Sequence, residues 1–125
     1  MHTIRLAAPF EVTIPPQDVT HRIKKWEAWA ALKVDTAPVL LVQRHFNLPS
    51  GLMPNQPVAL AVLATRYRLD VSLNNQPLGI VEPTDEPVRF PIREHLQPRN
   101  RIELRLSPSP WPPNSEPFQL QLQIE

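Results

Sequence analysis

Apolar and polar residues alternate along most of the chain, with the period of two that is typical of β-strands. The apolar members of the first run are Ile4, Leu6, Ala8, Phe10, Val12 and Ile14. The run ends at Pro15-Pro16, because proline has no N–H to donate to a strand ladder. The pattern predicts one extended strand up to residue 14.

Six further runs have strand character. They cover residues 39–48, 58–62, 67–73, 88–92, 102–106 and 118–124. Asn74-Asn75 follows the third of these runs, and asparagine tolerates the positive φ of a tight turn. Several short strands separated by turn signals are typical of a β-sandwich or barrel. The length of 125 residues suits a single domain over 1–125.

Residues 22–34 fit two interpretations. As a strand, Trp26, Ala28 and Ala30 would share a face. As a helix, Trp26, Trp29 and Ala30 would share one, and the segment contains good helix formers. We favour the strand because the rest of the chain has β character.

The composition narrows the classes of function. The chain has 17 prolines, two glycines and no cysteine, so disulfides and thiolate metal sites are excluded. The formal net charge is +1, a weak field for nucleic acid or an acidic membrane. We therefore expect no nucleic-acid or membrane partner, no metal and no cofactor. With no signal-peptide pattern at the start, we expect a cytoplasmic protein.

Three stretches of the sequence resemble one known family. They are Gln43-Arg44-His45-Phe46-Asn47-Leu48-Pro49, Asp70 to Gly79, and Val88 to Leu106. Their order of strands and turns is similar to that of the N-terminal jelly roll of family-two glycoside hydrolases, which has the galactose-binding-like fold. The resemblance covers about half the chain. It departs from the family at Asn75, where glycine is preferred, and at Pro91-Ile92-Arg93, where an acidic residue and threonine are usual.

The resemblance implies an all-β jelly-roll sandwich of galactose-binding-like type. In the family, the catalytic acid and nucleophile lie on a separate barrel, so the resemblance implies a binding or packing module and no hydrolysis. The residues agree with this expectation. The sequence has no Gly-x-Ser-x-Gly motif, and its acidic pairs, such as Asp85-Glu86, are of a kind that any acidic loop offers.

The candidate ligand-binding residues are two tryptophans and two arginines. Sugar rings stack on exposed aromatic side chains, and Trp29 and Trp111 could supply such surfaces, although core or capping roles are the alternative. Arg66 and Arg68 could form an anion-binding face, or they could pair with acidic residues across strands.

Two functions remain open. The first is a non-catalytic binding domain with carbohydrate as its ligand class. The second is a protein–protein or self-assembly module that uses a sheet face or the proline-rich loop at 107–114. The oligomeric state is left open.

Overall fold

A computed structural model describes residues 1–7, 9–14, 19–25, 39–107 and 117–125. Within these residues the chain forms two antiparallel sheets and a short 3-10 turn, η3 (Arg93–His95). The strands are β1 (His2–Arg5), β2 (Phe10–Ile14), β3 (Val19–Ile23), β4 (Leu40–Asn47), β5 (Val58–Thr65), β6 (Arg68–Leu73), β7 (Gln76–Val81), β8 (Val88–Pro91), β9 (Arg99–Ser107) and β10 (Phe118–Ile124). The predicted all-β sandwich is confirmed.

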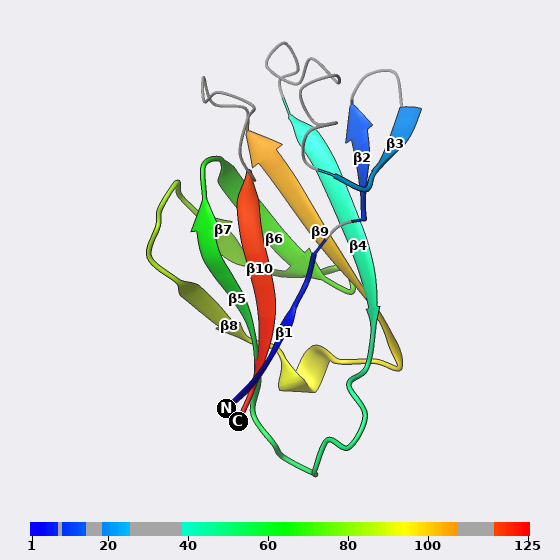
Figure 1. Cartoon of the computed structure of the whole chain (residues 1–125), viewed down its shortest axis with the longest axis vertical. Helices are drawn as coiled ribbons and strands as arrows, with labels where there is room; N and C mark the ends of the chain where they lie inside the picture. Colours follow the sequence, from blue (N-terminus) through cyan, green and yellow to red (C-terminus); the bar gives the residue numbers. More distant parts are fainter. Residues whose placement is uncertain (8, 15–18, 26–38, 108–116) are drawn as a thin grey trace.

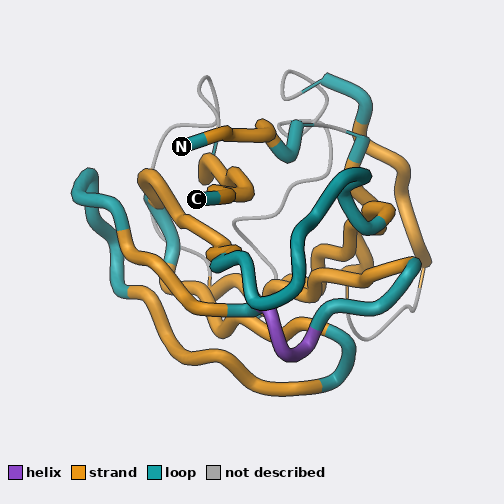
Figure 2. The backbone as a smooth tube through the Cα atoms, turned by 90° about the horizontal axis from the view of Figure 1, so that it is seen from below, coloured by secondary structure: helices purple, strands orange, loops and turns teal. Residues whose placement is uncertain are grey.

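The two sheets form the two layers of the sandwich (Figure 1). One sheet has the order β1-β10-β5-β8, and the other has the order β3-β2-β4-β9-β6-β7. Figure 2 views the molecule end-on and shows both layers curving around the space between them. The two ends of the chain lie side by side, because His2 pairs with Ile124 in the register of β1 and β10.

The first predicted strand is wrong in one respect. The run up to residue 14 is two strands in different sheets, since β1 pairs with β10 and β2 pairs with β3 and β4. The chain crosses from one layer to the other before β2, where Pro9 cannot donate to a ladder. Leu6 and Phe10 are both buried. The alternation continues through the crossing because both sheets turn their apolar face toward the same core.

The core follows the predicted alternation closely in the central strands. β9 pairs with β4 on one side and with β6 on the other. The buried apolar residues of these three strands are Leu40, Val42, Phe46, Leu69, Val71, Leu73, Ile102, Leu104 and Leu106. Apolar side chains of β5 and β10 face them from the opposite sheet, and the combined burial is the main stabilising term of the fold.

The turn predicted at Asn74-Asn75 is confirmed. Both residues have positive φ, 51° and 68°, as a two-residue hairpin turn of type I′ requires. Asn74 is also bonded outside the turn. Its Nδ2 donates to Asn100 Oδ1 at 2.9 Å, and its Oδ1 accepts from the backbone N–H of Arg101 at 2.9 Å. The turn is thereby tied to the start of β9.

Two strands were not predicted. β3 and β7 are both at edges of the larger sheet. β7 carries Pro77 and Gly79, which break the apolar alternation that identifies a strand. Of the ambiguous segment 22–34, Arg22 and Ile23 end β3. Residues 26–34 lie outside the described residues.

The described part of the chain contains no helix long and apolar enough to cross a membrane.

Candidate functional site

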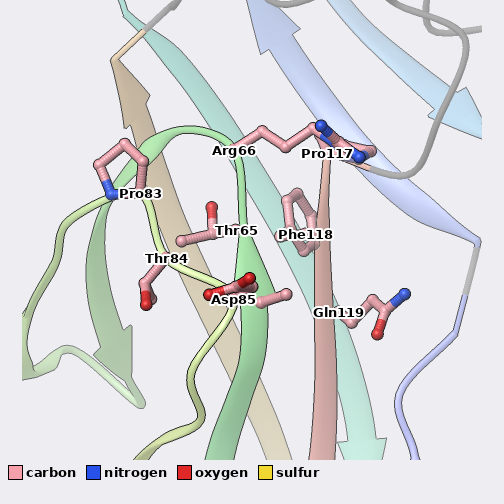
Figure 3. A pocket seen from close by; sticks show the side chains of 9 residues that line it. Thr65, Arg66, Pro83, Thr84, Asp85, Pro117, Phe118 and Gln119 are labelled. Carbon is pink, nitrogen blue, oxygen red and sulfur yellow. The ribbon is translucent and has the colours of Figure 1, made fainter.

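A pocket of about 410 Å³ opens at one end of the sandwich. Three separate segments line it: the end of β5 with the following turn, the loop between β7 and β8, and the start of β10. The lining residues are Ala64, Thr65, Arg66, Pro83, Thr84, Asp85, Pro117, Phe118 and Gln119 (Figure 3). We call this cavity the end pocket.

Backbone hydrogen bonds hold the three segments together. Thr65 and Thr84 exchange two of them, with N···O distances of 2.8 and 2.9 Å. The N–H of Arg66 donates to the carbonyl of Pro117 at 2.9 Å. The Thr65 hydroxyl donates to the carbonyl of Tyr67 at 2.7 Å and accepts from the N–H of Tyr67 at 3.1 Å. The pocket walls are therefore fixed by backbone contacts that do not depend on the exposed side chains.

The pocket has an apolar inner wall and a polar rim. Phe118 is 2% exposed, and its ring packs edge-on against Phe10 at a centroid distance of 5.3 Å. Arg66, Asp85 and Gln119 are exposed. Figure 3 shows Arg66 at one end of the pocket, with Asp85 and Gln119 toward the other. A cationic donor, an anionic acceptor and an amide that does both therefore surround one concavity.

The structure separates the two predicted arginines. Arg66 lines the end pocket. Arg68 is not among its lining residues and forms an ion pair with Glu82 at 3.2 Å, with 53% and 71% of the two side chains exposed. Trp29 and Trp111 lie outside the described residues, so the predicted aromatic surfaces stay predictions.

On β9, Arg101 forms its ion pair within its own strand and not across strands. Arg101 pairs with Glu103 at 2.8 Å, and Glu103 also accepts from the Gln43 amide at 3.3 Å across the β4–β9 ladder. The described residues contain no group of three or more His, Asp or Glu side chains that could hold a metal ion.

Sequence reasoning missed the residues that line the end pocket together with Arg66. Thr84 and Asp85 belong to the β7–β8 loop, and Gln119 comes from a strand more than thirty positions later. The alternation of β10 predicted that Gln119 faces outward. Nothing in the sequence predicted that these three segments would meet.

Comparisons with known proteins agree on the fold. No protein-family model and no curated protein sequence matches the chain. Among solved structures, it is similar to the FMN-binding beta-glucuronidase from Facaelibacterium prausnitzii L2-6, with a TM-score of 0.70 and 17% identity over 97% of this chain and 22% of that one. It is also similar to a beta-D-glucuronidase from Dictyoglomus thermophilum, with a TM-score of 0.73 and 10% identity over 97% and 27% of the two chains.

A third similar structure is the beta-D-mannosidase from Dictyoglomus thermophilum, with a TM-score of 0.72 and 13% identity over 86% of this chain and 16% of that one. The chain thus spans about a quarter or less of the length of each of these three glycosidases. Identities this low establish the fold alone. The chain has the β-sandwich found in glycosidases of this kind, as its sequence resemblance to family two predicted.

Proposed function

We propose that this protein is a non-catalytic carbohydrate-binding domain whose end pocket holds the sugar. The observation that carries the proposal is the meeting of Arg66, Asp85 and Gln119 around one pocket of about 410 Å³. Ligand pockets of about this size combine apolar walls with a few placed polar groups. The similarity in fold to a domain-sized part of glycosidases supports the same ligand class.

The polar groups of the pocket suit sugar hydroxyls, which donate and accept at once. The Asp85 carboxylate only accepts, the Arg66 guanidinium only donates, and the Gln119 amide does both. The neighbouring hydroxyl groups of one sugar ring can form hydrogen bonds with all three of these side chains. The buried Phe118 and Thr65 below them provide a fixed floor, and their place is set by the backbone.

A binding role is better supported than hydrolysis. Glycoside hydrolysis uses two carboxyl groups placed across the scissile bond. Among the described lining residues, Asp85 is the one carboxylate. A pocket with a single acid can bind a sugar but has no second group to act as nucleophile or base.

The alternative of a self-assembly module has less support. The outward positions of β9 are polar or charged, and two of them form an ion pair. The large apolar side chains that are exposed in the described residues are Met1, Leu48, Met53 and Ile80; Leu48 and Met53 share the β4–β5 loop, whereas Met1 and Ile80 belong to other parts of the chain. The 107–114 loop lies almost wholly outside the described residues.

Calorimetric titration of the chain with a panel of neutral and acidic monosaccharides and their methyl glycosides tests the proposal. We expect at least one saturable ligand. Arg66→Ala and Gln119→Ala should each weaken it about tenfold, since a hydrogen bond to a charged or well-placed group contributes about 1.5 kcal/mol. Arg68→Ala is the matched control, because it removes another exposed arginine, which lies outside the pocket. If the panel yields no ligand, or if Arg66→Ala binds as well as Arg68→Ala, the proposal fails.

A further inference from the structure

A second cavity, of about 270 Å³, lies where β2 begins beside β4. Its lining is rich in cationic side chains and shares no residue with the end pocket: Pro9, Phe10, Glu11, Arg22, Gln43, Arg44, His45 and Arg99. The register explains why it is open. β2 pairs with β4 only as far as Gln43, so the stretch of β4 from Arg44 to Asn47 extends beyond it. We call this cavity the edge cavity.

Three guanidinium groups line the edge cavity and have no carboxylate partner within the part of the chain that the structure describes. Among the described residues, the ion pairs that form are Arg68–Glu82 and Arg101–Glu103, and neither involves Arg22, Arg44 or Arg99. Glu11 stands opposite Arg22 in the β2–β3 register but makes no ion pair with it. Three positive groups and one negative group leave the lining with a charge of +2, even with His45 neutral. The lining of the edge cavity therefore has more cationic donors than carboxylate acceptors.

Arg44 is held in place before any ligand binds. Its Nε donates to the carbonyl of Ala7 at 2.7 Å, and its Nη1 donates to the carbonyl of His45 at 2.8 Å. Partial burial lowers the pKa of Arg44, because desolvation disfavours the charged form. Its Nη2 bonds to no described residue and is not among the fully buried atoms. A partly buried, positioned guanidinium with a free Nη2 suits an oxyanion, because charge-assisted hydrogen bonds are stronger than neutral ones.

We propose that the edge cavity is a binding site for one oxyanion group, a carboxylate or a sulfate, carried by a small molecule. Arg44 supplies a fixed donor, and the exposed Arg22 and Arg99 close on the anion from β3 and β9. The Gln43 amide and His45 add neutral hydrogen-bonding groups. The volume admits a single small group and excludes a long anionic polymer. The site is independent of the end pocket, and its test can succeed or fail separately.

The test is a titration followed by NMR, with sodium sulfate, sodium glucuronate and neutral glucose added at ionic strength held constant with sodium chloride. The Nε–Hε signals of the arginine side chains are the readout. We expect saturable shifts of the Arg44 signal with sulfate or glucuronate and none with glucose. The two anions distinguish a tetrahedral from a planar group, and saturation by either supports the site.

The double variant Arg22→Gln and Arg99→Gln should weaken the anion about tenfold or more, because it removes two charge-assisted contacts. The matched control is Arg68→Gln with Arg105→Gln, which removes the same charge from exposed arginines outside the cavity. Circular dichroism verifies that both variants fold. Equal weakening in the two double variants, or shifts that stay linear with every anion, would overturn the proposal.

Discussion

Asn100 is the polar side chain on which the junction of three segments depends. It is fully buried, with 0% exposure. Its Oδ1 accepts from Asn74 Nδ2 at 2.9 Å and from the N–H of Gln97 at 2.8 Å. Its Nδ2 donates to the carbonyl of Gln97 at 2.8 Å and, at a long 3.5 Å, to that of Phe46. One amide thus joins β4, the β6–β7 turn and the loop before β9.

Asn100→Leu removes these bonds while keeping the same branched skeleton of side-chain heavy atoms. A buried polar group left without its partner costs about 1–3 kcal/mol. Three bonds of normal length are lost, but Gln97 is exposed and water can replace part of what it loses. We therefore expect the free energy of unfolding to fall by about 3 kcal/mol. That is a large share of the roughly 5–15 kcal/mol that holds a domain folded.

Equilibrium unfolding in urea, followed by circular dichroism, measures this change. The control is Asn47→Leu, an asparagine at the end of β4 that is exposed and should change stability by no more than about 0.5 kcal/mol. A loss below about 1 kcal/mol in Asn100→Leu, with an unchanged denaturant slope, would refute the idea that this network stabilises the fold.

Three further predictions follow from local geometry. Asn75→Gly should change stability by no more than about 1 kcal/mol, because glycine favours positive φ while one exposed bond from Arg101 Nη2 is lost, whereas Asn74→Gly should lower it by about 2 kcal/mol because three side-chain bonds are lost; chemical denaturation of the pair compares them. Gly79→Ala should cost about 1–3 kcal/mol, since a Cβ would stand 2.9 Å from the Phe90 ring, and Phe90→Leu in the same chain should recover part of that loss in a double-mutant cycle. Arg44→Lys should lower the melting temperature by several degrees, because a lysine cannot donate from two fixed positions to the two carbonyls that Arg44 binds.

Each of these has an outcome that contradicts it. If Asn74→Gly and Asn75→Gly are equally stable, the hydrogen bonds that the Asn74 side chain makes outside the turn contribute nothing to stability. If Phe90→Leu does not reduce the stability lost in Gly79→Ala, the strain lies in the backbone and not in the contact with the Phe90 ring. If Arg44→Lys is as stable as the parent protein, a positive charge at position 44 is sufficient for stability and the two carbonyl contacts add nothing.

Where side chains alternate over a continuous run, the sequence was enough to locate the strand. β6, β9 and β10 lie where the pattern predicted them, because apolar residues alternate with polar ones along each; the polar residues of β6 and β9 are exposed or half-buried apart from Asn100, whereas in β10 Gln123 is buried as well. The Asn74-Asn75 turn was equally predictable, since few residue types other than glycine and asparagine adopt the positive φ that it requires. The resemblance to family-two glycosidases correctly gave the fold of the sandwich.

The alternation did not reveal in which sheet a strand lies. β1 and β2 read as one run, because a strand in either layer must turn its apolar side inward. The sequence did not predict β7, because Pro77 and Gly79 break its apolar alternation. An edge strand is paired on one side only and tolerates such residues.

By itself, the sequence determined the class of fold, most of the inward-facing residues and the position of the Asn74-Asn75 turn, because these depend on local periodicity and on allowed φ. The tertiary structure alone decided that Arg66, Asp85 and Gln119 line one pocket, and that Arg22, Arg44 and Arg99 share a cavity. Strand order and register bring these residues together. Both arise from contacts between segments far apart in the chain, which no local pattern records.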